Sequence, residues 1–356
     1  MKKINIKNIK RPLYKADFKE IASRSLDNSQ KIKVSILCLC FNHAPYIRRC
    51  IDNFLRQKVN FNVEILIHDD ASTDGSIEIL KEYEQKYPDV IKVIFEKENQ
   101  YSKGINIENT ILSKYVQGKY VAICEGDDFW NNPFKLALQV QCFEQFPGVS
   151  FVVHKVLNQN LSGQKIGFIP EKIKHSTIFD RVEIVPRIIK SYTFHTTSYL
   201  FKSSDFLHYC DNLPKFAKHL KVGDYGLQLY FSNLGKTIYL DEEMSVHVDN
   251  VPGSWTEKSR KATIEQSSSE RKNIIESLEL FDEFTTQEFH KSYQERYIKA
   301  RMHELYALGK YAEIIDDRNF RRALFRYDPK SCIAIYLMVK RPALYRRLKT
   351  WKRKAN

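Results

Sequence analysis

The stretch Lys119-Tyr-Val-Ala-Ile-Cys-Glu-Gly-Asp-Asp-Phe-Trp130 joins a short apolar run directly to three carboxylates. Such a run is typical of a strand covered on both faces, as in a parallel sheet. Glu125, Asp127 and Asp128 then follow so closely that their mutual repulsion is costly unless a cation lies among them. Mg²⁺ and Mn²⁺ accept oxygen ligands, so the stretch predicts a strand end that holds a divalent metal. A solvated acidic turn is the simpler alternative.

Strand and helix patterns alternate in the residues before this stretch. Strands are predicted at 34–40, 63–68 and 91–95, and helices at 47–55, 77–87 and 107–116. This alternation predicts a doubly wound α/β sheet that binds ligands at the carboxyl ends of its strands. After residue 150 the pattern is less regular, and beyond about residue 259 the composition predicts amphipathic helices.

A second acidic loop, His68-Asp-Asp-Ala-Ser-Thr-Asp-Gly75, ends another apolar strand. Asp70 at that strand end can accept a hydrogen bond from the imide nitrogen of a uracil. Asp74 can equally cap the helix that follows. Because the ends of parallel strands share one edge of a sheet, we expect Asp70 to lie on the same side as Asp127 and Asp128.

The ordered set of motifs resembles the nucleotide-binding half of family 2 glycosyltransferases. The resemblance covers about residues 33 to 146 and rests on Val34-Ser-Ile, Phe41-Asn42, the loop at 68–75, Gly118-Lys-Tyr-Val-Ala and Glu125-Gly-Asp-Asp. It implies the GT-A fold, a Rossmann-like, mostly parallel central sheet flanked by helices, here with a C-terminal helical extension. It also implies an inverting transfer of a sugar from a nucleotide sugar, with UDP favoured, to an acceptor hydroxyl.

By position, the resemblance implies roles on the donor side. Phe41 would pack against the base, and Asp70 would read it. Asp127 would lie nearer the ribose and share the metal, Mn²⁺ or Mg²⁺, with Asp128. Lys103, in the Asn-rich segment 99–106, is the candidate for a contact with the diphosphate.

On the acceptor side, Asp224 in Val222-Gly-Asp-Tyr-Gly-Leu-Gln stands where the family keeps its catalytic carboxylate. It would take the proton of the acceptor hydroxyl, although a helix cap is the alternative. His195 or Ser198 would line the acceptor pocket. His247 would complete the metal shell, or else face solvent, and Trp255 would close over the sugar as a lid.

The net charge of +14 is concentrated at the two ends of the chain. Residues 1–33 hold ten Lys or Arg against three acids, and residues 340–356 hold eight against none. We therefore expect a basic N-terminal arm at 1–30, a donor-binding half at 31–150, an acceptor-binding half at 151–258 and a helical region at 259–356. The basic C-terminal helix would contact an anionic inner membrane, with a solvated tail as the alternative, and no nucleic acid is expected.

The charged amino end lacks a signal-peptide core, and the seven cysteines show no CxxC spacing, so a cytoplasmic, reduced protein is expected. Its expected function is metal-dependent sugar transfer in cell-surface polysaccharide or glycolipid synthesis.

One alternative is a non-catalytic relative that binds a nucleotide sugar or glycan. A sugar nucleotidyltransferase is less favoured, because it needs a Gly-rich loop after the first strand and residues 38–46 contain no glycine.

Overall fold

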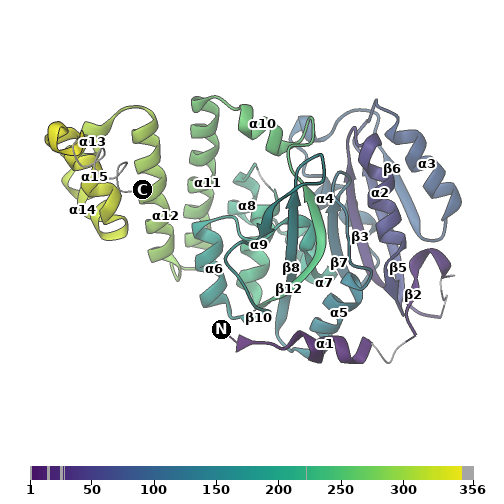
Figure 1. Ribbon diagram of the computed structural model, residues 1–356. Helices are drawn as coiled ribbons and strands as arrows, with labels where there is room; N and C mark the ends of the chain where they lie inside the picture. Colours follow the sequence, from purple (N-terminus) through teal and green to yellow (C-terminus); the bar gives the residue numbers. More distant parts are fainter. Residues whose placement is uncertain (1, 14–16, 25–26, 28, 222, 347–356) are drawn as a thin grey trace. The chain divides into compact units, whose positions relative to one another are not determined.

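The computed structural model describes residues 2–13, 17–24, 27, 29–221 and 223–346. These residues form two compact units, each described here by itself. The first takes its described residues from 2–188, 192–214 and 223–260, and the second from 189–191, 215–221 and 261–346 (Figure 1).

The elements follow one another in the order that Figure 1 labels. The strands are β1 Lys2–Lys3, β2 Lys19–Glu20, β3 Ile32–Cys40, β4 Lys58–Val59, β5 Asn62–Asp69, β6 Ile91–Phe95, β7 Tyr120–Glu125, β8 Val149–Gln159, β9 Lys165–Ile169, β10 Thr177–Phe179, β11 Leu200–Lys202 and β12 Lys236–Val248. The α-helices are α1 Ile6–Leu13, α2 Ala44–Leu55, α3 Ser76–Lys86, α4 Ile107–Thr110, α5 Lys135–Gln145, α6 Arg181–Lys190, α7 Ser203–Asp211, α8 Lys215–His219, α9 Gly223–Leu234, α10 Trp255–Lys261, α11 Ile264–Phe284, α12 His290–Ala307, α13 Tyr311–Asp316, α14 Arg318–Tyr327 and α15 Pro329–Lys340.

A mixed, mostly parallel sheet forms the centre of the first unit. Within the described residues its order is β1-β10-β12-β8-β11-β7-β3-β5-β6, and β9 pairs with β8. Strands β7, β3, β5 and β6 run parallel to one another, as the alternation of strands and helices predicts. The short strand β11 is antiparallel to both β7 and β8 and thereby joins the two halves of the sheet.

Helices cover both faces of this sheet because alternate side chains of each strand point to opposite faces. On one face, Val152 and Leu200 join a buried cluster with residues of α2, α3 and α5. On the other face, Phe151 and Phe201 pack against Phe231 of α9, and the Phe201 and Phe231 rings stack with centroids 4.1 Å apart. This two-sided burial explains why the central strands are largely apolar.

The amino-terminal segment contributes to the first unit. Strand β1 extends the sheet by pairing with β10, and the side chains of Ile9 and Ile21 are buried in the same cluster as α2 and α5. Two apolar side chains therefore anchor this basic segment to the first unit.

The second unit contains a separate helical cluster. Ile298, Met302 and Leu305 of α12 pack with buried residues of α13, α14 and α15. The helices expected from the composition beyond residue 259 are therefore present. Among the described residues, no helix has the length and apolar character needed to cross a bilayer.

One expected helix is interrupted. Residues 107–116 form the four-residue α4 and a 3₁₀ helix at Leu112–Tyr115 instead of one continuous helix. The Asn106 side chain caps α4 by accepting a hydrogen bond from the backbone N–H of Asn109 at 2.9 Å. The Ser113 hydroxyl donates to the Asn109 carbonyl, a bond that competes with regular helix continuation.

Candidate active site

The carboxyl ends of β3, β5 and β7 bring the two acidic loops to one edge of the sheet. Cys40 at the end of β3 pairs with Asp69, and Leu39 pairs with Glu125. Because β3 alone separates β5 from β7, the loops after those strands begin about 10 Å apart, two strand spacings. Asp70 and Asp127 therefore share one side of the sheet, as the sequence predicts.

Gly126 permits the close turn between Glu125 and Asp127. Its N–H donates to the Leu39 carbonyl at 2.8 Å, and a Cβ at this position would lie 2.9 Å from His43 Nδ1 and 2.9 Å from Ile47 Cδ1. Any side chain here would push the loop away from β3. The glycine thus fixes the place at which Asp127 and Asp128 leave the sheet.

A short antiparallel contact brings His247 to Asp128. Phe129 forms an isolated bridge with Val246, in which the two residues exchange backbone hydrogen bonds of 3.2 and 2.8 Å. The backbone N–H of Val248 also donates to Asp128 Oδ1 at 2.9 Å. The end of β12 is therefore held against the acidic loop, although about 120 residues separate the two in sequence.

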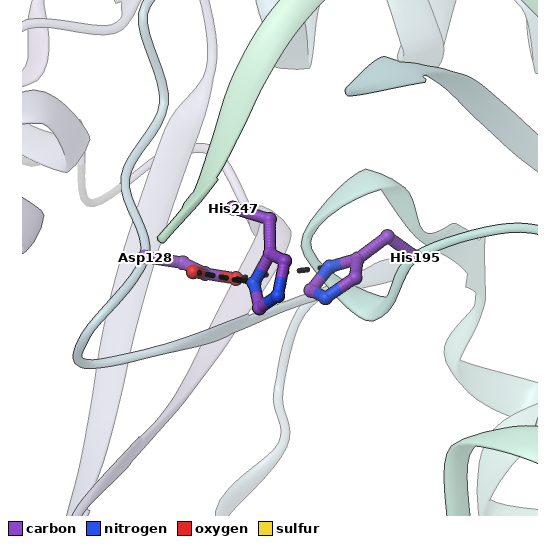
Figure 2. Close-up of side chains that lie close together, drawn as sticks. All are labelled: Asp128, His195 and His247. Atoms are coloured by element: carbon purple, nitrogen blue, oxygen red, sulfur yellow. Dashed lines mark hydrogen bonds and ion pairs between the residues drawn. The ribbon is translucent and has the colours of Figure 1, made fainter. Parts of the chain in front are cut away.

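Asp128, His195 and His247 form a cluster in which one ligand atom of each lies within 4.8 Å of the others (Figure 2). His247 Nδ1 lies 3.1 Å from Asp128 Oδ1, and His195 Nδ1 lies 3.7 Å from Asp128 Oδ2. The two imidazole rings are 4.1 Å apart between centroids. Within the described residues this is the one such cluster of potential metal ligands.

The electrostatics of the cluster suit a cation. Burial alone would raise the pKa of Asp128, but the neighbouring His247 and His195 outweigh it and hold the pKa below its usual value. Burial, with His247 beside it, lowers the pKa of His195 to about 3, so this ring is neutral. Its Nδ1 accepts a 3.4 Å hydrogen bond from the Thr197 backbone N–H, so the proton of the neutral ring lies on Nε2, and a metal bound at Nδ1 would replace that hydrogen bond.

This donor set of one ionised carboxylate and two imidazoles fits a divalent first-row metal. Imidazole favours a transition metal over Mg²⁺, which prefers oxygen ligands. Sequence reasoning paired Asp128 with His247, and the structure brings these two together. It adds His195, which sequence reasoning placed in the acceptor pocket. The sequence feature that could have indicated His195 as a ligand is its position as a histidine within the otherwise uncharged segment Phe194–Ser198.

Asp127 lies beside this cluster and faces a different histidine. Its Oδ2 is 3.8 Å from His43 Nε2. Burial raises the pKa of Asp127, and His43 partly offsets the increase. Burial, with Asp128 and Asp127 nearby, also raises the pKa of Glu125 well above its usual value. The three carboxyls of the acidic loop therefore resist being ionised together unless a cation binds beside them.

The residues predicted to bind the nucleotide base lie at the same edge of the sheet. Phe41 follows β3 directly and its ring is 42% exposed, as an aromatic platform requires. Asp70 is buried, and its two oxygens accept hydrogen bonds from the backbone N–H groups of Gln100 and Tyr101 at 2.6 and 3.1 Å. Asp70 thus fixes the segment that follows β6. Lys103, at the end of that segment, is exposed and forms an ion pair with Glu98.

Asp74 ties the loop after β3 to the loop after β5. Its Oδ2 accepts a hydrogen bond from the Ala44 N–H at 2.9 Å, and its Oδ1 accepts two from Ser76, at 3.0 Å from the N–H and 2.6 Å from the hydroxyl. Ala44 and Ser76 are the first residues of α2 and α3. The hydrogen bonds of Asp74 are therefore those of a helix cap, the role that the sequence allowed for it.

Asp224 lies in the first turn of α9 with hydroxyl partners. Its Oδ2 accepts hydrogen bonds from the Tyr192 hydroxyl and, at 3.0 Å, from the Thr196 hydroxyl. Its Oδ1 is buried and has no hydrogen-bond partner among the described residues. Burial raises the pKa of Asp224, while Tyr192 and Thr196 oppose the increase. Sequence reasoning missed both hydroxyl partners.

Two further predicted positions differ in exposure. Ser198 is fully buried, and its hydroxyl donates to the His195 carbonyl at 2.6 Å, so it supports the loop and does not line an open pocket. Trp255 begins α10 and is 50% exposed, so its role as a lid stays a prediction.

The sheet and its acidic edge are those of the GT-A fold. Residues 35–206, just under half of the chain, match the family described as Glycosyl transferase family 2. This region is therefore a family 2 glycosyltransferase domain, which confirms for it the family and fold inferred from the sequence.

Relatives of known sequence match about a third of the chain. An uncharacterized protein of Mycobacterium tuberculosis, Rv1520, is 36% identical over 123 residues, which are 35% of each chain. The putative teichuronic acid biosynthesis glycosyltransferase TuaG of Bacillus subtilis is 31% identical over 128 residues, 36% of this chain and 48% of that one. The match thus spans about a third of the length of the first of these relatives.

A solved structure of similar fold covers more of the chain. S. aureus TarS 1-349 in complex with UDP-GlcNAc aligns with a TM-score of 0.56 and 18% identity, covering 91% of this chain and 93% of that one. At this identity the likeness concerns the fold.

Proposed function

We propose that this chain transfers a sugar from a UDP-sugar to an acceptor hydroxyl with inversion, in the synthesis of a cell-surface polysaccharide or glycolipid. The observation that carries the proposal is the cluster of Asp128, His195 and His247 at the sheet edge that also holds Asp70. A nucleotide sugar needs both the metal cluster and Asp70, because its diphosphate and its base require different partners. The uridine-diphosphate sugar bound to TarS supports the choice of donor.

Asp128, His195 and His247 would hold the divalent metal, with Asp127 beside them. When bound, the metal supplies positive charge to the diphosphate that leaves the sugar. Neutral His195 is ready to act as a ligand without losing a proton, and Asp128 is ionised. The Val248 N–H and the bridge at Phe129 fix the carboxylate before any ligand binds.

The donor nucleoside would bind between the loops after β3 and β5. Phe41 offers an exposed ring for stacking against the base. Asp70 holds the Gln100–Tyr101 backbone and keeps lone pairs that can accept the imide N–H of uracil. Lys103 would have to leave Glu98 to reach a diphosphate.

Asp224 would act as the general base through Oδ1. Tyr192 and Thr196 occupy Oδ2, so the oxygen without a partner is the one able to take a proton from the acceptor hydroxyl. The raised pKa of this carboxyl makes it a stronger base than an ordinary aspartate. The sugar carbon is attacked from the face opposite the departing diphosphate, which inverts its configuration.

The test is turnover of a panel of UDP-sugars by the full chain, with and without Mn²⁺. We expect slow metal-dependent hydrolysis of one donor in the absence of acceptor. Asp128→Ala should lose turnover and metal-dependent nucleotide binding together, whereas Asp224→Asn should bind donor normally and lose transfer. Donor binding without turnover in the unmodified chain would favour a non-catalytic binder, and normal transfer by Asp224→Asn would refute the base assignment.

Two expectations from the sequence belong to this proposal. If the chain divides into a donor half and an acceptor half as proposed, the metal cluster takes Asp128 from the first and His195 and His247 from the second. The expected membrane contact through residues 340–356 falls mostly on 347–356, which lie outside the described residues.

A further inference from the structure

Helices α14 and α15 of the second unit combine basic and large apolar side chains on exposed positions. Residues 318–346 contain eight Lys or Arg and a single acid, Asp328. Asp328 is occupied at the start of α15, where its carboxylate accepts a hydrogen bond from the Ser331 N–H at 3.1 Å. The segment therefore presents a strong surplus of positive charge.

The exposed positions recur at helical spacing. On α14, Arg318, Arg322, Phe325 and Arg326 are exposed while Leu324 is buried. No ion pair is recorded for these three arginines within the part of the chain that the structure describes, so their charges are available to a partner.

Helix α15 repeats this arrangement. Ile333, Tyr336 and Lys340 are exposed, although Lys340 forms an ion pair with Asp316 at 3.1 Å. Cys332 and Ile335 are buried in the same cluster as Leu324. The outer faces of both helices thus point away from one shared core. Phe325, Ile333, Tyr336 and Leu344 are each 45–55% exposed. We call this set of exposed residues on α14, α15 and Leu344 the basic-apolar surface.

We propose that the basic-apolar surface binds an anionic lipid bilayer at its interface. Anionic headgroups complement the arginines and lysines, and the exposed rings and aliphatic side chains enter the boundary of the acyl chains. Helix α15 has 12 residues, so it lies on a bilayer and does not span it. This surface extends the proposed function by placing the chain at a membrane, and it does not depend on sugar transfer.

Other occupants fit the surface less well. A second copy of the chain would bring two faces of the same positive sign together, which is unfavourable. A soluble polyanion would use the arginines but would leave the four large apolar side chains in water. A solvated face has no need of those side chains at helical spacing.

The test is flotation of the full chain with lipid vesicles in the absence of any sugar donor. Vesicles of neutral phosphatidylcholine are compared with vesicles that contain about 30% phosphatidylglycerol. We expect binding to the anionic vesicles alone, weakened by high salt. Since each arginine contributes about a fivefold change in affinity, Arg322→Gln with Arg326→Gln should weaken binding about 25-fold.

A matched control removes two exposed lysines of the first unit, Lys172→Gln with Lys174→Gln, and should bind as the unmodified chain does. Phe325→Ser with Ile333→Ser keeps all charges and should weaken binding about tenfold. Thermal melting checks that the variants fold, which their exposed positions favour.

Equal binding to neutral and anionic vesicles, or equal loss in the arginine and control variants, would overturn the proposal. Unchanged binding of the Phe325 and Ile333 variant to anionic vesicles would show attraction by charge alone, which overturns the proposed entry of the apolar side chains into the bilayer. A concentration-dependent dimer in sedimentation that this variant abolishes would identify an interface between copies. A failure of sugar transfer leaves these vesicle measurements unaffected, so the two proposals are tested separately.

Discussion

Replacing Tyr192 by Phe removes one hydrogen bond from the proposed base and nothing else from its carboxylate. The Tyr192 hydroxyl donates to Asp224 Oδ2, and Thr196 donates to the same oxygen at 3.0 Å. A hydrogen bond to a charged group is worth about 1.5–3 kcal/mol, and one pKa unit corresponds to about 1.4 kcal/mol. Because this bond stabilises the ionised form, its loss should raise the pKa of Asp224 by about 1 to 2 units.

The direction of the effect on rate follows from the role of the base. Asp224 must be ionised to take a proton, so the acid limb of kcat/KM should move to higher pH by about 1 to 2 units. The carboxyls of Glu108 and Glu125 also face this group, because Asp224 contributes to their raised pKa values. They are present in both proteins, and the comparison with the unmodified chain cancels their contribution. Well above the limb, the two rates should converge.

The assay is the pH profile of kcat/KM for transfer, with metal and nucleotide sugar held constant. Tyr83→Phe is the matched control, because the Tyr83 hydroxyl donates to Asp52 Oδ1 at 2.7 Å, away from the site. The control should keep the profile of the unmodified chain. An acid limb that Tyr192→Phe leaves in place would refute the assignment of Asp224 as the titrating base.

Three further predictions concern residues that support the site. Gly126→Ala should destabilise the fold by about 1–3 kcal/mol in thermal melting, because its Cβ would lie 2.9 Å from His43 Nδ1. Asp74→Ala should cost about 1 kcal/mol by uncapping α2 and α3, measured by urea unfolding. Burial lowers the pKa of Lys135 to about 7. Between about pH 7 and 10 the unfolded chain binds the extra proton, so stability should rise by up to about 1.4 kcal/mol per pH unit, a slope that Lys135→Met lacks.

Each of these predictions has an outcome that contradicts it. Unchanged melting of Gly126→Ala would show that the acidic loop tolerates a shift away from β3. Unchanged unfolding of Asp74→Ala would mean that its hydrogen bonds are replaced by water at no cost. Parallel stability curves for Lys135→Met and the unmodified chain would mean that the lysine stays charged in the folded state.

The donor half could be predicted from the sequence because its signals are local. A mostly apolar run such as 63–68 predicts a buried strand, and the acidic loops follow such runs directly in the chain. Parallel strands then require the loops to share an edge, which is why Asp70 and Asp127 were expected on one side. The interruption at 107–116 was not visible, because the bond from the Ser113 hydroxyl to the Asn109 carbonyl is not encoded in helical periodicity.

The metal cluster shows where such reasoning stops. The resemblance to the family suggested His247 as a metal ligand, but its contact with Asp128 depends on the bridge between Phe129 and Val246. The same resemblance placed His195 on the acceptor side. The sequence around a histidine does not predict which strand will lie beside its side chain. Long-range register decides this, and register depends on the packing of the whole sheet.

The segment 192–198 connects the two chemical functions of the proposed site. Tyr192 and Thr196 hold the carboxylate of Asp224, and His195 between them faces Asp128. A shift of this short segment would move a metal ligand and both partners of the base together. The Gln139 amide donates to the Ser198 carbonyl at 2.8 Å, and Tyr199 Oη donates to the Phe194 carbonyl at 3.1 Å, so buried groups hold the segment at both ends. We therefore expect changes at the buried Gln139 to alter metal affinity and base strength in parallel.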